Sequence, residues 1–164
     1  MMGAGKTSLG KQLARRLGRR FVDADDEVEV RTGVDISRIF EIEGDAGFRK
    51  REAQVLAALA QEDGLVIATG GGVVLDAQNR ATLTKSGIVV YLSVSPELLW
   101  DRLRQDKKRP LLQVADPRNQ LQKHHAQRDP LYRQVADIVI ERGGGNIHHL
   151  AKLIEHQIRV RFAE

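Results

Sequence analysis

The chain has 164 residues, of which 41% are hydrophobic and 29% are charged, a balance typical of one globular domain with its own core. It contains no cysteine, which excludes disulfides and cysteine-bound metal sites. No apolar run approaches the roughly 18 residues of a membrane-spanning helix, and no secretory signal is visible. We therefore expect a single domain over residues 1–164 that is cytoplasmic and has no membrane partner.

The net charge of +4 limits the classes of ligand that the chain is expected to bind. A positive balance is found in proteins that bind nucleic acids, anionic lipids or small anions. Aromatic residues make up only 4% of the chain, so surfaces that stack the bases of single strands are not expected. Many arginines lie in or beside motifs typical of small-anion sites. We therefore expect small anionic substrates and no nucleic acid, whose binding would show a steep salt dependence.

Helical and strand-like patterns alternate along the chain. Helices are expected over residues 6–17, 25–31, 35–41, 45–62, 76–85, 96–105 and 118–134, the last with a break at Asp129-Pro130, and from residue 146 onward. Strands are expected over residues 19–23, 65–69, 88–93 and 137–141. Residues 107–117 are polar and contain proline, which indicates a mobile loop. The alternation predicts an α/β fold with a parallel sheet and right-handed crossovers.

The chain opens with most of a phosphate-binding P-loop, formed by Gly3, Ala4, Gly5, Lys6, Thr7 and Ser8. In such a loop successive backbone N–H groups cradle phosphate oxygens, and the helix that follows adds the positive end of its dipole. Lys6 would reach the β- and γ-phosphates of a nucleotide, and the Thr7 hydroxyl would bind Mg²⁺. The alternative interpretation is a glycine-rich turn that caps a helix.

The strand that normally precedes a P-loop is missing from this sequence. The first glycine of the motif would fall one residue before Met1. The four visible strands and this missing first strand would make a parallel five-stranded sheet, with the missing strand in its middle. We expect Met1 to be an internal methionine of a longer natural chain. Without that strand, both neighbouring strands would have unpaired hydrogen-bonding groups, which predicts low stability and weak activity.

Five further motifs follow the P-loop in order. They are Asp23-Ala24-Asp25, Phe48-Arg49, Gly70-Gly71-Gly72, Arg109-Pro110-Leu111-Leu112 and Pro130-Leu131-Tyr132-Arg133. Together with the P-loop they resemble the shikimate kinase family over essentially the whole chain. The resemblance implies a three-layer P-loop kinase fold with helices on both faces of the sheet. It also implies a monomer that uses ATP and Mg²⁺ to convert shikimate to shikimate 3-phosphate in aromatic amino-acid (chorismate) biosynthesis.

The resemblance also implies roles for two carboxylates. Asp23 would hold Mg²⁺ through water, opposite Thr7. Asp25 would bind the substrate hydroxyls and is the candidate general base, because a carboxylate within hydrogen-bond reach can accept the hydroxyl proton. It could instead mainly orient the hydroxyl, since the transition state of phosphoryl transfer is loose. The alternative role for Asp23 is that of a helix cap.

The remaining roles implied by the resemblance concern arginines and glycines. Arg49 and Arg133 would bind the substrate carboxylate, because a guanidinium matches a carboxylate in two parallel hydrogen bonds. Glu52 would hold Arg49 in place, and the backbone of Gly70, Gly71 and Gly72 would contact the substrate. Arg109 would belong to a lid over the phosphates within residues 107–117, and Arg102 would pack near the adenine. The alternatives are ordinary surface arginines and a flexible glycine turn.

Other interpretations remain open on the sequence. Another small-molecule P-loop kinase, such as a gluconate kinase, would share the loop but does not require Arg49, the glycine triplet and Arg133 together. A non-catalytic nucleotide-binding module is a second alternative. His124 and His125 are adjacent on a predicted helix and therefore face different directions, which predicts solvated surface residues and no metal site.

Overall fold

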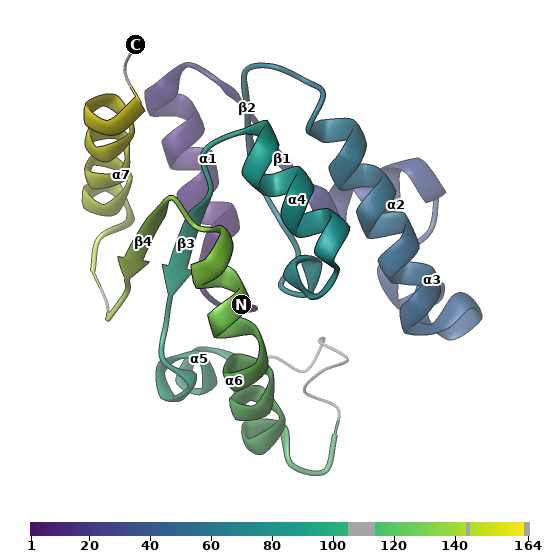
Figure 1. Cartoon of the computed structure of the whole chain (residues 1–164). Coiled ribbons are helices and arrows are strands. Elements are labelled where there is room, and N and C mark those ends of the chain that lie inside the picture. Colours follow the sequence, from purple (N-terminus) through teal and green to yellow (C-terminus); the bar gives the residue numbers. More distant parts are fainter. Residues whose placement is uncertain (105–113, 144, 163–164) are drawn as a thin grey trace.

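The structure is a computed structural model that describes residues 1–104, 114–143 and 145–162 (Figure 1). In chain order its elements are α1 (Lys6–Leu17), β1 (Arg20–Asp23), α2 (Ala24–Thr32), α3 (Ile36–Leu59), β2 (Leu65–Ala68), the 3₁₀ turn η1 (Val73–Leu75), α4 (Ala77–Ser86), β3 (Val90–Ser93), α5 (Pro96–Leu103), α6 (Pro117–Val135), β4 (Ile138–Glu141) and α7 (Ile147–Phe162). The predicted alternation of helices and strands is confirmed. Most of the predicted loop at residues 107–117 lies outside the described residues.

Local signals fix most of the helix ends. Helix α1 stops at Gly18, whose φ of 65° lies in the left-handed region that favours glycine. Helix α4 begins after Asp76, whose carboxylate accepts hydrogen bonds from the first backbone N–H groups of the helix. Helix α5 begins after Ser95 with Pro96 in its first turn. Because these signals depend on neighbouring residues alone, the sequence predicts them well.

Two helices differ from the prediction. Helix α3 was expected as two helices, but it is one element with a kink at Gly44, where φ is 68° and ψ is −172°. Helix α6 was expected to break at Asp129-Pro130, yet it continues through Pro130. A proline removes one backbone donor, and buried residues before and after it, Leu121 and Tyr132, anchor both halves of α6 in the core.

The strands form two separate parallel pairs in the described part of the chain. Strand β1 pairs with β2, with Arg20 opposite Leu65, and β3 pairs with β4, with Val90 opposite Ile138. The sequence analysis expected a parallel sheet whose middle strand is absent from this sequence, and the two separate parallel pairs agree with that expectation.

Helices cover both faces of the strands, which gives the three layers expected of a P-loop fold. Helix α1 packs against α7 on one face, and α4 and α6 contact η1 on the other (Figure 1). A smaller apolar cluster lies between α2 and α3, where Phe48, Val55 and Leu59 are buried. No helix in the described ranges is long and apolar enough to cross a bilayer. The carboxyl ends of β1 and β4 lie near the start of α1, since Asp23 contacts Thr7 and Arg142, directly after β4, contacts Ala4. This is the edge at which open α/β sheets bind ligands.

Candidate active site

The predicted P-loop forms a turn directly before α1. Gly3 and Gly5 have φ values of 75° and 89°, so both lie in the left-handed region. Ala4 between them is fully buried, and the Lys6 ammonium donates to the carbonyl of Met1 at 2.8 Å. Ser8 and Thr7 are exposed in the first turn of α1. A turn of this kind at the start of a 12-residue helix is suited to bind phosphate.

Two arginines from other elements contact the same loop. Arg102 on α5 donates to the carbonyl of Gly3 at 3.3 Å, and Arg142, directly after β4, donates to the carbonyl of Ala4. Burial, together with the charge of Arg102, lowers the pKa of Arg142. The sequence analysis did not single out Arg142. An anion bound here would offset the repulsion between the two guanidinium groups.

Thr7 and Asp23 lie together at the mouth of the loop. The Thr7 hydroxyl donates to Asp23 Oδ2 at 2.8 Å, and Asp23 Oδ1 accepts from the backbone N–H of Asp25 at 3.1 Å. Asp23 is thus also the cap of α2, as the alternative interpretation had it. Hydroxyl and carboxylate oxygens suit Mg²⁺, which usually takes its remaining ligands from phosphates and waters. In the described part of the chain no cluster of three or more histidines and carboxylates could hold a metal alone.

The glycine triplet after β2 is the point at which the charged side chains converge. A Cβ atom at Gly70 would lie 2.5 Å from Glu52 Oε1 and 2.9 Å from Asp25 Oδ1. At Gly72 it would collide with the guanidinium of Arg49, and at Gly71 it would lie 3.4 Å from Arg128 Nη1. Gly70 and Gly72 thus make room for charged groups, which a flexible turn does not require, whereas the contact at Gly71 would be an ordinary van der Waals one.

The Asp25 carboxylate is mostly buried and lies near several charged side chains. Burial, reinforced by the charges of Asp23 and Glu52, raises the pKa of Asp25 to about 6, while Lys6 and Arg49 act in the opposite direction. Asp25 Oδ1 and Glu52 Oε1 are buried and find no hydrogen-bond partner among the described residues. The structure therefore brings Lys6, Asp25 and Arg49 together, beside two buried carboxylate oxygens with capacity to accept a hydrogen bond from a polar ligand.

Arg49 is held in place by carboxylates of its own helix. Its Nη1 donates to Glu52 at 2.8 Å, and its Nε lies 3.4 Å from Asp45. The Glu52 side chain is 2% exposed, so this ion pair is largely shielded from water. The position expected for Glu52, beside Arg49, is thus the one that the structure shows.

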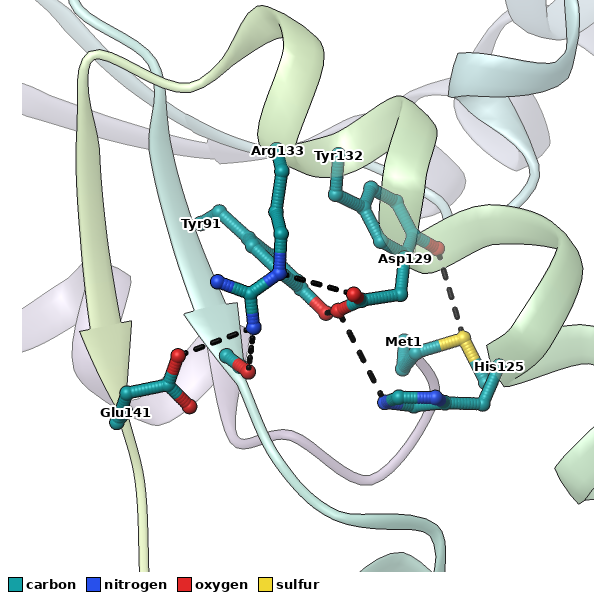
Figure 2. A network of polar contacts seen from close by, with 8 residues as sticks. Met1, Tyr91, His125, Asp129, Tyr132, Arg133 and Glu141 are labelled. Atoms are coloured by element: carbon teal, nitrogen blue, oxygen red, sulfur yellow. Dashed lines mark hydrogen bonds and ion pairs between the residues drawn. The ribbon is translucent and has the colours of Figure 1, made fainter.

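The structure does not bring Arg133 to this group, and the prediction that it lies beside Arg49 is corrected. Arg133 donates to Asp129 at 2.9 Å, to Glu141 at 3.0 Å and to Ser93 at 3.2 Å, and its side chain is 45% exposed (Figure 2). These partners lie on α6 itself and on β3 and β4. The Tyr91 hydroxyl donates to the same Asp129 at 2.6 Å, so Arg133 belongs to a structural network.

Arg128, five residues earlier on α6, occupies the position expected for Arg133. It is 7% exposed, and its buried Nε finds no hydrogen-bond partner among the described residues. Tyr132 lies one turn further along α6 and donates to the carbonyl of Gly71. Burial raises the pKa of Tyr132 to about 12, and the charges of Arg128, Glu52 and Arg49 also act on it. Arg128 and Arg49 therefore flank the glycine triplet.

Comparison with known proteins identifies the family. The family model described as shikimate kinase matches residues 2–159 of the chain. The chain belongs to the shikimate kinase family. The shikimate kinase of Aromatoleum aromaticum is 55% identical over 97% of this chain and 91% of its own length. That of Dechloromonas aromatica is 57% identical over 86% of this chain and 77% of its own length.

Solved structures of shikimate kinases agree with the fold. The shikimate kinase from Acinetobacter baumannii in complex with shikimate superimposes with a TM-score of 0.95 at 48% identity, covering 99% of this chain and 91% of that one. The enzyme from Aquifex aeolicus gives a TM-score of 0.81 at 32% identity, covering 98% of this chain and 95% of that one. The P-loop kinase fold is thereby confirmed, and the chain is a shikimate kinase relative, not a gluconate kinase.

Two residues of this shikimate kinase relative, Arg102 and Arg109, were predicted to contact the bound nucleotide. Arg102 contacts the P-loop, as described above, while Arg109 lies outside the described residues.

The His124 and His125 side chains are partly buried, so their prediction as solvated residues is corrected. His124 contacts Gln120 at 2.9 Å, and His125 lies 4.0 Å from Asp129.

Proposed function

We propose that this chain transfers the γ-phosphoryl group of ATP to a hydroxyl of shikimate, giving shikimate 3-phosphate and ADP in aromatic amino-acid biosynthesis. Membership of the shikimate kinase family supports the reaction. The observation that carries the residue assignments is the glycine triplet Gly70–Gly72, around which Asp25, Arg49 and Arg128 converge beside the P-loop.

The nucleotide half of the site consists of the P-loop and the basic residues around it. Backbone N–H groups of Gly3–Ser8 would bind the terminal phosphates of ATP, with Lys6 adding a positive charge. Arg102 and Arg142 lie close enough to neutralise further phosphate charge. Mg²⁺ would be held by Thr7 and, through water, by Asp23, and when bound it supplies neutralisation of the charge on the transferring phosphates.

The acceptor half of the site binds the acidic ring. Arg49 and Arg128 would share the carboxylate of shikimate, because two guanidinium forks provide parallel hydrogen bonds to it. Glu52 keeps Arg49 in position through the 2.8 Å contact. Backbone groups of Gly70–Gly72 lie between the two arginines and Asp25, where no side chain separates them from the ring.

Asp25 is the proposed general base. Its pKa of about 6, raised first by burial, means that the carboxylate is largely ionised at neutral pH yet still basic enough to take a proton. As the hydroxyl oxygen of shikimate forms its bond to the γ-phosphorus, its proton passes to Asp25. The bond from that phosphorus to the bridging oxygen breaks at the same time, and ADP leaves with the electron pair.

Some assignments extend past the described residues. Arg109 is proposed to bring positive charge to the transferring phosphoryl group, and closure of the loop that carries it is proposed to exclude water as a competing acceptor. We also propose a cytoplasmic monomer that acts on small molecules, since ATP and shikimate suffice as substrates and the half-sites described above come from one chain.

An assay of ADP release tests the proposal. We expect ADP release that requires shikimate, is not supported by gluconate, and is lost in Asp25→Asn. ATP binding with no turnover on shikimate would instead favour a non-catalytic nucleotide-binding module. ADP release at the same rate without shikimate would refute the acceptor half of the site.

A further inference from the structure

Backbone hydrogen bonds hold the two outer carbonyls of the glycine triplet. The carbonyl of Gly70 accepts from the N–H of Val73 at 3.3 Å. The carbonyl of Gly72 accepts from the N–H of Leu75 at 3.0 Å. The carbonyl between them accepts from no backbone N–H among the described residues. Because glycine peptides rotate more freely than others, the orientation of this middle peptide depends on a separate constraint.

The Tyr132 hydroxyl on α6 supplies that constraint. It donates to the carbonyl of Gly71, and the tyrosine is 7% exposed. The sulfur of Met1 lies 3.6 Å from the same hydroxyl, but a thioether is a weak acceptor beside a carbonyl oxygen. Burial raises the pKa of Tyr132 to about 12, so the hydroxyl keeps its proton and acts as a donor at neutral pH.

The direction of this carbonyl sets the direction of the next N–H group. In a trans peptide the C=O of one residue and the N–H of the next point in opposite directions, and no peptide bond in the described residues is cis. Since the Gly71 carbonyl faces Tyr132, the N–H of Gly72 faces away from α6. It donates to no backbone carbonyl of the described chain, and the Arg49 guanidinium lies against Gly72. The Gly72 N–H is therefore a donor beside Arg49.

The same hydroxyl also contacts Arg128. A Cβ atom at Gly71 would lie 3.4 Å from Arg128 Nη1 and 3.5 Å from the Tyr132 hydroxyl, so the two side chains meet at this glycine. A hydrogen bond with Arg128 opposes the rise in the pKa of Tyr132. Because a hydroxyl can donate one hydrogen bond and still accept others, Tyr132 can hold the carbonyl and the guanidinium together.

Packing against Tyr91 fixes the ring of Tyr132. The two rings are stacked, with centroids 4.8 Å apart and planes inclined by 28°. Tyr91 on β3 is 5% exposed, and its hydroxyl donates to Asp129 at 2.6 Å (Figure 2). The two stacked tyrosines thus direct their hydroxyls to different partners, and only that of Tyr132 bonds the glycine triplet.

We propose that Tyr132 is a positioning residue for the acceptor carboxylate, whose hydroxyl aims the Gly72 N–H and the Arg128 guanidinium at the carboxylate that Arg49 also binds. The inference rests on the proposed phosphorylation of shikimate and deepens the acceptor half of that site. Because the carboxylate takes no part in the chemical step, its donors bind substrate and transition state alike. Their misalignment should therefore raise the KM for shikimate without lowering kcat.

The test removes one hydroxyl of the stacked pair at a time. Tyr132→Phe keeps the ring that packs on Tyr91, and we expect the KM for shikimate to rise about 3- to 10-fold. The kcat and the KM for ATP should change less than about twofold. In the matched control Tyr91→Phe all three constants should stay within about twofold of the unsubstituted chain. A purely structural role would instead reduce the folded fraction, which lowers kcat and leaves KM unchanged.

A measurement on the unsubstituted chain does not depend on the folding of either variant. On addition of shikimate without nucleotide, the amide proton signal of Gly72 should move more than that of Gly18 at the far end of α1. An unmoved Gly72 signal at saturating shikimate would overturn the proposal. So would an unchanged KM for shikimate in folded Tyr132→Phe, or an equal rise in Tyr91→Phe. Absence of shikimate-dependent ADP release in the unsubstituted chain would refute the proposed function itself, and this inference with it.

Discussion

Replacing Arg128 by methionine tests whether Arg128 or Arg133 of α6 binds the substrate carboxylate. Arg128→Met keeps the length and the apolar stem of the side chain but removes the guanidinium that lies beside Gly71, where the side chain is 7% exposed. A hydrogen bond to a charged group contributes about 1.5–3 kcal/mol, and each 1.4 kcal/mol changes a binding constant about tenfold. The KM for shikimate should therefore rise about 10- to 150-fold, while the KM for ATP changes less than about twofold.

The matched control is Arg133→Met in the same helix. That guanidinium is 45% exposed and ion-paired to Asp129 and Glu141, and because exposed ion pairs contribute little to stability, its removal should leave the fold almost as stable as before. Steady-state ADP release, with shikimate and ATP varied in turn, should show an unchanged KM for shikimate. If Arg133→Met raised that KM tenfold and Arg128→Met did not, the assignment of Arg128 would be refuted.

Three further predictions concern the same site. The kcat/KM for shikimate should fall about tenfold per pH unit below about pH 6, because protonation of Asp25 removes the proton acceptor; a profile that stays flat down to pH 5 would exclude this role. Gly72→Ala should raise the KM for shikimate at least tenfold, since its methyl group would displace the Arg49 guanidinium; Gly87→Ala, which has open space around it, should not change that KM. Asp23→Asn keeps an oxygen that can cap α2 but removes the negative charge, so the Mg²⁺ concentration for half-maximal activity should rise severalfold; an unmoved Mg²⁺ titration would separate Asp23 from the metal.

The elements of the fold were predictable because their signals are local. The stop at Gly18 and the caps at Asp76 and Ser95 depend on residues within one turn of the chain. The pairing of strands is not local, and the partners, β1 with β2 and β3 with β4, became visible only in three dimensions. Arg142 was missed for the same reason. Its contact partner Ala4 is far away in the sequence, and the pairing of β4 with β3 places Arg142, directly after β4, near the P-loop.

The exchange of Arg133 for Arg128 has a different cause, since both lie on one helix. Tyr132 is 7% exposed, and its hydroxyl reaches Gly71, so its face of α6 points toward the glycine triplet. Residues four apart share a helix face, which places Arg128 with Tyr132, whereas Arg133 is rotated by about 100°. The spacing of four residues between Arg128 and Tyr132 therefore predicts that they share a helix face. The expected helix break at Pro130 prevented this spacing from being used. Because α6 continues through Pro130, helix periodicity holds on both sides of the proline and places Arg128, not Arg133, beside the glycine triplet.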